Sequence, residues 1–298
     1  MNVLDKCDQV VIYGANGWMG RSAIDYISTV LPGHATETLL LIGSKPSLLE
    51  INGKYFNVLD PVQGYSRICE GAIFFNAAFL RREKLQSTPS IDYLQQNEII
   101  ASLAKNALKN KKLKSFINLS SGAARETEIL PSLRTPDEYS TIKKYLEVEY
   151  SHLCAEYSTA FVNCRIFSLS GKYINEFDNL ALSSFIKQAT LNNRIEVKSP
   201  NTKRTYIDGA DLSETLLTLA NDSRSVFLDS GGSLVTLLEL AHCVSRIMNN
   251  GNCEVTTQNE NSPSYFGNYQ EFNEIALRAG QTLLSVEEQI VKTITAFT

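Results

Sequence analysis

Three glycines near the start of the chain constrain its fold more than any other feature. The segment Gly14-Ala15-Asn16-Gly17-Trp18-Met19-Gly20 follows the apolar run Val10-Val11-Ile12-Tyr13 and leads into a stretch typical of a helix from Arg21. A strand, a glycine turn and a helix in this order let the backbone turn sharply and direct free helix N–H groups at a phosphate. The alternative is an ordinary turn, since the spacing is G-x-x-G-x-x-G rather than G-x-G-x-x-G. We expect a dinucleotide pyrophosphate to be bound by Gly14, Asn16, Gly17, Trp18, Met19 and Gly20.

The first half of the chain alternates segments that favour strands with segments that favour helices. Strands are expected at 10–13, 38–42, 72–76, 115–119 and 160–167, and helices from 21 onward, at 91–110 and at 138–157. This alternation predicts an α/β fold with a doubly wound parallel sheet. We expect a Rossmann domain over residues 1–170 and a smaller, mainly C-terminal substrate lobe over 171–298, with part of the chain returning to the first domain.

The second half is expected to be richer in helices. The pattern predicts helices at 180–191, after Asp211, at 234–248 and at 286–295, with a polar loop at 199–203. Asp211 is interpreted as a helix cap.

Composition excludes several classes of protein. With 28 basic and 32 acidic residues the formal net charge is −4, so nucleic acid is not an expected partner. The longest aliphatic run, at 39–42, is far shorter than the ~20 residues that a membrane-spanning helix needs, so we expect no membrane association and a cytoplasmic location. The six cysteines show no C-x-x-C spacing and the three histidines form no cluster, which predicts free thiols and no metal site.

A phenol and an ammonium group lie one helical turn apart in Tyr139-Ser140-Thr141-Ile142-Lys143. A nearby cation favours the phenolate form of tyrosine, which suits proton exchange with a substrate hydroxyl or carbonyl. Such a pair also arises by chance, so its significance depends on Ser121, which follows the expected strand and lies where parallel strands expose side chains to a ligand. The alternative for Ser121 is a loop-capping residue.

At this point the chain resembles the extended branch of the short-chain dehydrogenase/reductase family, which contains nucleotide-sugar epimerases, dehydratases and reductases. The resemblance is ordered along most of the chain. It rests on the three glycines, on Phe75-Asn76-Ala77-Ala78, Ser120-Ser121, Tyr139-x-x-x-Lys143 and Arg165, and on the segment from Arg204 to Asp211.

The resemblance implies a role for each matching residue. Tyr139 would donate or accept the proton, Lys143 would bind the cofactor ribose and tune the tyrosine, and Ser121 would polarise the reacting oxygen. The same resemblance implies a homodimer formed through two helices, the one that begins near Ile91 and the one that carries Tyr139. The remaining contacts that it implies are Asn76, Ala77 and Ala78 along the cofactor, Asp60 at the adenine, and Arg204 at the diphosphate of a nucleotide-linked substrate, with a surface salt bridge as the alternative for Arg204.

Departures from the family pattern narrow the expected reaction. Sugar dehydratases of this family place an Asp-Glu pair after the catalytic hydroxyl residue, whereas Ser121 is followed by Gly122-Ala123, which disfavours dehydration. Relatives often have Tyr-Gly shortly afterwards, where this chain has Arg125-Glu126, so we assign Arg125 to an unusual substrate-facing rim.

The residues at the end of the second strand predict which of the two nicotinamide cofactors the chain prefers. NAD-binding folds offer a carboxylate to the ribose there, whereas this strand is followed by Gly43-Ser44-Lys45-Pro46. Ser44 and Lys45 suit a 2′-phosphate, which favours NADP(H) over NAD(H), although Lys45 can also be a simple loop lysine. The leading hypothesis is a nucleotide-sugar 4-ketoreductase that uses NADP(H). The alternatives are an epimerase that retains NAD, a reductase of a small carbonyl compound, and a non-catalytic protein that senses NADP.

Overall fold

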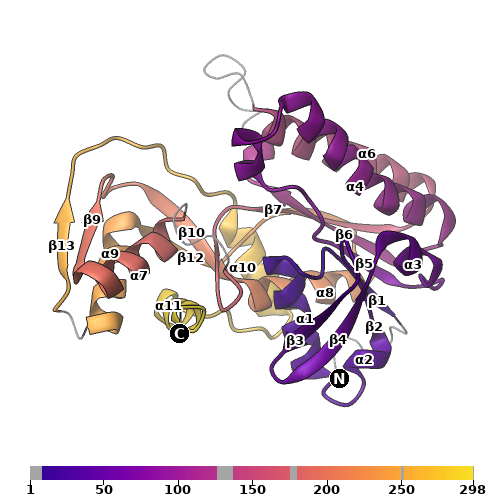
Figure 1. The fold of residues 1–298 in the computed structure, drawn as a ribbon, viewed down its shortest axis with the longest axis horizontal. Coiled ribbons are helices and arrows are strands. Elements are labelled where there is room, and N and C mark those ends of the chain that lie inside the picture. Colours follow the sequence, from indigo (N-terminus) through magenta and orange to yellow (C-terminus); the bar gives the residue numbers. More distant parts are fainter. Residues whose placement is uncertain (1–8, 126–136, 175–179, 250–251, 298) are drawn as a thin grey trace. The chain divides into compact units, whose positions relative to one another are not determined.

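The computed structural model describes residues 9–125, 137–174, 180–249 and 252–297. The chain divides into two compact units (Figure 1). The first comprises Met1–Arg165 and Ser213–Leu228, and the second comprises Ile166–Leu212 and Asp229–Thr298. The chain therefore leaves the first unit, returns to it and leaves it again.

The first unit is built on an eight-stranded sheet in the order β11-β7-β6-β5-β1-β2-β4-β3. The pairs β1–β2, β1–β5, β2–β4 and β5–β6 are parallel, which confirms the expected α/β fold. The strands are β1 (Val10–Tyr13), β2 (Leu39–Ile42), β3 (Ser47–Ile51), β4 (Lys54–Leu59), β5 (Ile73–Asn76), β6 (Ser115–Ser121), β7 (Ala160–Ile166) and β11 (Val226–Asp229).

Helices cover both faces of this sheet (Figure 1). The helices α3, α4 and α6 lie on one face, and α1 and α8 lie on the other. The bounds are α1 (Trp18–Val30), α2 (Ala35–Thr38), α3 (Pro61–Ser66), the 3-10 helix η1 (Arg82–Gln86), α4 (Ser90–Asn110), α6 (Glu138–Glu156) and α8 (Gly209–Asn221).

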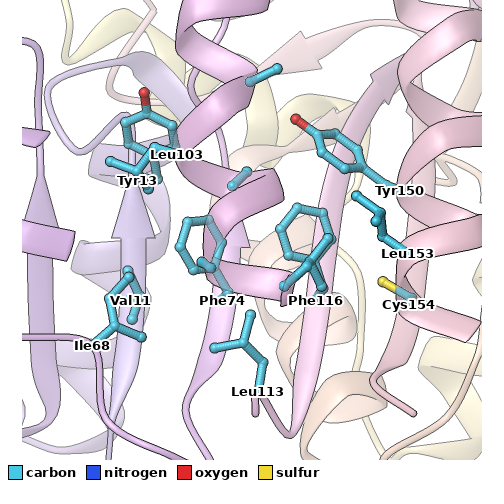
Figure 2. Packing of buried hydrophobic residues seen from close by; sticks show 14 of the residues in the cluster. Val11, Tyr13, Ile68, Phe74, Leu103, Leu113, Phe116, Tyr150, Leu153 and Cys154 are labelled. Carbon is cyan, nitrogen blue, oxygen red and sulfur yellow. The ribbon is translucent and has the colours of Figure 1, made fainter. Parts of the chain in front are cut away.

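Aromatic side chains from neighbouring strands form the core beneath α4 and α6 (Figure 2). The rings of Phe74 on β5 and Phe116 on β6 stack with centroids 5.4 Å apart, and Tyr150 on α6 packs on Phe116 at 4.9 Å. All three side chains are less than 2 % exposed. Side chains alternate between the two faces of a β-sheet, so Phe74 and Phe116 lie on the face that α4 and α6 cover. Neighbouring residues such as Ile12 and Ile73 are buried on the opposite face.

One hairpin was not predicted from the sequence pattern. The strands β3 and β4 pair in antiparallel register from Ser47 opposite Val58 to Ile51 opposite Lys54. Asn52 and Gly53 join them with φ angles of 50° and 75°, the left-handed conformations that a tight two-residue hairpin turn requires. The sheet is thus mostly, but not wholly, parallel.

In the described residues of the second unit there are two small sheets, in the orders β12-β10-β8 and β13-β9, and four helices that lie wholly within the unit. Its core combines Phe185 and Ile186 of α7 with Leu240 and Val244 of α9 and Ile290 of α11. Its elements are β8 (Leu169–Ser170), α7 (Ala181–Asn192), β9 (Arg194–Val197), β10 (Lys203–Asp208), β12 (Ser233–Thr236), α9 (Leu237–Asn249), β13 (Glu254–Thr257), α10 (Tyr269–Arg278) and α11 (Val286–Ile294).

Two expectations for the second half are corrected. The helix expected at 234–248 begins only at Leu237, because the preceding residues pair with β10 as β12. The cap of α8 is Asp208 rather than Asp211: Asp208 accepts a hydrogen bond from the N–H of Ala210 at 2.9 Å. Asp211 lies in the first turn and accepts from the N–H of Leu284 at 2.8 Å instead.

No helix within the described residues is long and apolar enough to span a membrane. The cysteines of the described residues, including the buried Cys154 and Cys164, are free thiols, and Cys7 lies outside those residues.

Candidate active site

The glycine segment forms a tight turn between β1 and α1 in which side chains would not fit. Gly14 has a φ of +91°, and a Cβ atom there would lie 2.7 Å from the backbone of Ala77 and Ala78, just after β5. A Cβ on Gly20 would overlap the carbonyl oxygen of Gly14. The first glycine thus lets the turn approach β5, and the third lets α1 pack against the turn.

Gly17 occupies the N-cap position of α1 and is exposed. Gly17 has no side chain that could cap the free N–H groups of α1. The first turn of α1 also contains no acidic residue that would repel an anion at this end of the helix. The backbone of Ala77 and Ala78, which the family resemblance implies would run along the cofactor, lies beside the turn. The turn therefore fits a bound pyrophosphate, and Met19 lies buried in the first turn of α1 that follows it.

Ser44 and Lys45 follow β2 and are both exposed. Next to them, the side chain of Asn16 donates a hydrogen bond to Ser47 at 3.2 Å, which joins the glycine turn to the start of β3. Asp60 caps α3 by accepting hydrogen bonds from the N–H groups of Val62 and Gln63, both at 2.9 Å. A structural role thus accounts for one carboxylate oxygen of Asp60.

Lys143 lies on α6, and its side chain is buried. Its Nζ donates a hydrogen bond to the carbonyl oxygen of Leu119 on β6 at 2.8 Å and lies 3.8 Å from the centroid of the Phe79 ring. Burial lowers the pKa of Lys143 to about 7, against the opposing influence of Glu147. Lys143 therefore titrates near neutral pH. Its hydrogen-bond acceptor, Leu119, lies two residues before Ser121 on β6.

Tyr139 lies one turn before Lys143 on α6 and shares a neighbour with it. Its ring packs edge-on against Phe79 with centroids 5.6 Å apart, and the guanidinium of Arg82 lies 5.7 Å from the ring centroid. Arg82 also pairs with Asp137, the N-cap of α6, at 2.5 Å. Residues that follow β5 thus fix the start of the helix that carries the phenol.

Ser121 ends β6 and is 7 % exposed. Its Oγ accepts a hydrogen bond from the N–H of Ala123 at 3.2 Å, the loop-capping bond considered from the sequence. A hydroxyl also carries a proton, so this bond does not prevent Ser121 from donating to a substrate oxygen. The structure brings Ser121 and Lys143 to the same end of β6, and it joins Lys143 to Tyr139 through Phe79.

The other assigned residues fall in different surroundings. Asn76 is buried and donates a hydrogen bond to Asn118 of β6 at 3.4 Å. Arg125 lies four residues after the end of β6 and is half-buried. Arg204 belongs to the second unit, where its guanidinium lies 5.7 Å from the ring centroid of Tyr265. Its Nε is buried with no hydrogen-bond partner among the described residues, which suits an anionic ligand.

Sequence reasoning missed Phe79, Arg82, Asp137 and Glu147. Glu147 carried a signal, since it lies four residues after Lys143 and eight after Tyr139 and therefore shares their helix face. Asp137 also carried one, because an aspartate directly before a helical segment predicts a cap. Nothing local marks Phe79 and Arg82, which reach the site through the path of the chain after β5. Within the described ranges no cluster of His, Cys, Asp and Glu is able to hold a metal ion.

Comparisons with known proteins place this geometry in context. Residues 10–227 match the model of the NAD dependent epimerase/dehydratase family. No curated protein matches the chain.

Solved structures with a similar fold cover nearly the whole chain. The UDP-N-acetylglucosamine 4-epimerase from Methanobrevibacter ruminantium, in complex with UDP-N-acetylmuramic acid, has a TM-score of 0.77 at 17% identity over 98% of both chains. The protein RMD from Pseudomonas aeruginosa, complexed with NADPH, has a TM-score of 0.70 at 17% identity over 97% of this chain and 98% of that one. The UDP-glucose 4-epimerase from Thermus thermophilus, in complex with NAD, has a TM-score of 0.69 at 14% identity over the same shares.

Proposed function

Since the chain belongs to the NAD-dependent epimerase/dehydratase family of short-chain dehydrogenase/reductase enzymes, we propose that it is an NADP(H)-dependent reductase of a keto group on a nucleotide-linked sugar. The observation that carries this proposal is the buried Lys143, which hydrogen-bonds Leu119 on β6 near Ser121 and shares the Phe79 ring with Tyr139. The hydroxyl of Ser121 and the phenol of Tyr139 then act on one reacting oxygen, and the ammonium of Lys143 acts on the phenol.

A nicotinamide bound at this site would supply the hydride, and the chain's own residues handle the proton. Ser121 donates a hydrogen bond that polarises the substrate carbonyl, and Tyr139 transfers its phenolic proton to the carbonyl oxygen as the hydroxyl forms. Lys143, as an ammonium ion, stabilises the phenolate left behind and holds the ribose of the cofactor. A proton from solvent then restores Tyr139. The glycine turn and the N-terminus of α1 hold the pyrophosphate.

The preference for NADP(H) is supported by the end of β2. Ser44 and Lys45 are exposed there, and the loop from Gly43 to Pro46 between β2 and β3 contains no acidic residue. A 2′-phosphate would gain an ion pair with Lys45 and meet no carboxylate. We assign the diphosphate of the substrate to Arg204, whose buried Nε lacks a protein partner among the described residues, and a rim position to Arg125.

Purified protein provides the first test. NADPH and NADH affinities are measured by fluorescence titration, and NADPH oxidation is followed with a panel of nucleotide-linked keto sugars. Tyr139→Phe should retain cofactor affinity and lose about 10²–10⁴-fold in turnover, since it removes only the acid. Unchanged turnover in that variant would contradict the assigned mechanism and favour a protein that senses NADP. Equal wild-type affinities for the two cofactors would contradict the NADP(H) assignment.

An epimerase is the second candidate, because two of the three compared structures are 4-epimerases. An epimerase oxidises and reduces the same carbon and retains its cofactor. Tightly held NAD released on denaturation, together with interconversion of sugars without added cofactor, would favour it over the reductase. Loss of affinity for free nucleoside diphosphates in Arg204→Gln separates both from a reductase of small carbonyl compounds.

A homodimer through α4 and α6 is part of the proposal. These helices pack against each other and carry exposed apolar side chains, among them Ile99 at 71 %, Tyr145 at 51 % and Val148 at 44 % exposure. Exposed apolar side chains on paired helices are compatible with a protein interface.

A further inference from the structure

Phe79 is an aromatic residue that no sequence motif assigns, and it contacts both members of the Tyr139–Lys143 pair. It lies in the short segment between β5 and η1 and is half-buried. The Nζ of Lys143 lies over the Phe79 ring, 3.8 Å from its centroid. The Tyr139 ring packs against the same ring with centroids 5.6 Å apart and an angle of 86° between the ring planes. One side chain from outside α6 therefore touches both functional residues of that helix.

Two buried side chains of α4 hold the segment that carries Phe79. The amide oxygen of Asn97 accepts a hydrogen bond from the N–H of Leu80 at 2.9 Å, and the hydroxyl of Tyr93 donates one to the carbonyl oxygen of Leu80 at 2.7 Å. Asn97 is 1 % exposed and Tyr93 is fully buried, and the amide of Asn97 also donates to the carbonyl oxygen of Tyr93 at 3.0 Å. Because both backbone polar groups of Leu80 are bound by α4, the position of the neighbouring Phe79 is restricted.

An ion pair attaches the same segment to the start of α6. Arg82, three residues after Phe79, donates from Nε to Oδ2 of Asp137 at 2.7 Å, and the other carboxylate oxygen of Asp137 accepts from the N–H of Ser140 at 2.9 Å. The guanidinium of Arg82 lies 5.7 Å from the centroid of the Tyr139 ring. The segment is thus held by α4 at Leu80 and by α6 at Arg82, and Phe79 lies next to these two attachments.

The face of an aromatic ring suits a buried ammonium group. It carries the negative part of the ring quadrupole, which attracts a cation most strongly where water is excluded. Lys143 is 8 % exposed, and its ammonium donates a hydrogen bond to the Leu119 carbonyl oxygen at 2.8 Å. Burial lowers the pKa of Lys143 to about 7, because the charged form has lost its contact with water. The Phe79 ring acts in the opposite direction, since it attracts only the charged form.

The charged side chains on the elements packed around Lys143 are held in pairs of their own. The titratable groups on this side of α6 and on its neighbours are Asp137, Tyr139 and Glu147 of α6, Arg82 of η1, Tyr93 of α4 and Arg165 of β7. Arg82 pairs with Asp137, and Arg165 pairs with Glu147 at 2.7 Å. The strand β6 contributes no titratable side chain. A change confined to the Phe79 ring removes none of these charges, so the titration of Lys143 reports on the ring contact.

We propose that Phe79 is a positioning residue of the reaction centre, whose ring face holds the Lys143 ammonium while its contact with Tyr139 keeps the phenol beside that ammonium. The role rests on the proposed function, in which the Lys143 ammonium stabilises the Tyr139 phenolate. A side chain that only fills space is replaceable by an aliphatic one, because leucine buries apolar surface without offering a π face. An aromatic requirement therefore separates the two roles.

The test is a direct titration of Lys143 in the cofactor-free protein. Lysine side chains are labelled with ¹⁵N, the Lys143 signal is assigned by its absence in Lys143→Arg, and its chemical shift is followed from pH 5 to 10. Phe79→Leu should lower the midpoint by about one pH unit, a tenfold change in the protonation equilibrium, because the ammonium loses the ring face. Phe79→Tyr keeps a π face and should restore a midpoint close to that of the wild type.

Phe161→Leu is the matched control. It removes a phenylalanine ring from the same unit, one that packs on Phe116 and Phe227. The Lys143 midpoint should not move in this variant. A midpoint that shifts as far in Phe161→Leu as in Phe79→Leu would show that any lost ring disturbs Lys143, which overturns the proposal.

A graded measurement keeps the shape of the side chain nearly constant and replaces the first one should Phe79→Leu fail to fold. Phenylalanine with one, two or three ring fluorines is incorporated at position 79, which weakens the negative face of the ring stepwise. The Lys143 midpoint should fall with each added fluorine.

Two further results overturn the proposal. One is a midpoint that stays at the wild-type value in Phe79→Leu or across the fluorinated series. The other is a midpoint that moves equally in Phe79→Leu and Phe79→Tyr. Cofactor affinity is measured separately, so a failure of the proposed function appears as absent NADPH and NADH binding while the titration still reports on the contact between Phe79 and Lys143.

Discussion

Replacing Gly14 with alanine tests whether the first glycine is required by packing before any ligand is present. The residue has a φ of +91°, and an L-residue held in the left-handed region costs about 1–2 kcal/mol. The added Cβ would also lie 2.7 Å from the backbone of Ala77 and Ala78, which cannot rotate away. Overpacking of this kind costs about 1–3 kcal/mol, so Gly14→Ala should destabilise the first unit by about 2–5 kcal/mol.

Gly17→Ala is the matched control. Gly17 has an ordinary φ of −77°, and its added Cβ would meet only the Gly14 carbonyl oxygen, at 3.2 Å. Urea unfolding of cofactor-free protein, followed by circular dichroism, measures the free energy of unfolding of both variants. We expect Gly17→Ala to stay within about 1 kcal/mol of wild type, since a cap change from glycine is mild, and yet to bind NADPH more weakly. If Gly14→Ala is as stable as Gly17→Ala, the packing argument is wrong.

Three further predictions concern charge and surface. Because the pKa of Lys143 is about 7 in the folded chain and 10.5 ordinarily, the unfolded chain binds one more proton between these two pH values, and the free energy of unfolding rises with pH there. Lys143→Met should remove up to about 1.4 kcal/mol per pH unit of this rise between pH 7.5 and 9. Equal pH slopes for wild type and variant, measured by urea unfolding, would contradict the buried placement of Lys143. Lys45→Glu should weaken NADPH binding while sparing NADH, as measured by fluorescence titration, and parallel losses would remove Lys45 from the cofactor site. Ile99→Lys should yield a monomer by light scattering, whereas Leu48→Lys on β3, 64 % exposed against 71 % for Ile99, should not. An unchanged mass in Ile99→Lys would exclude this face as the interface.

Local patterns were enough to predict the central strands and the long helices of the first unit. The apolar segment at 10–13 became β1 as expected, and α4 and α6 begin and end within one residue of their predicted bounds. The strand is a short, wholly apolar segment followed by a glycine turn, and α6 is preceded by Asp137, whose side chain caps it. The hairpin at Asn52-Gly53 carried an equally clear turn signal that the alternating α/β pattern obscured.

Contacts between distant parts of the chain could not be predicted. The pairing of residues 233–236 with β10 turned the start of an expected helix into β12, since a strand partner outweighs local helix propensity. The site shows the same division. Tyr139 and Lys143 follow from their spacing on one helix, whereas the contacts of Phe79 and Arg82 depend on how the segment after β5 folds back over α6.

The path of the chain has a consequence for how the protein is made. The strand β7 ends at Ile166, but its outer neighbour β11 begins only at Val226, about 60 residues later. At synthesis rates of about 5–20 residues per second, the ribosome needs about 3–12 seconds to deliver the missing strand. During that interval the unpaired backbone of β7 is able to pair with other chains. We therefore expect chaperones to be needed during translation, and the need to fall when slow codons between β7 and β11 are replaced by fast ones.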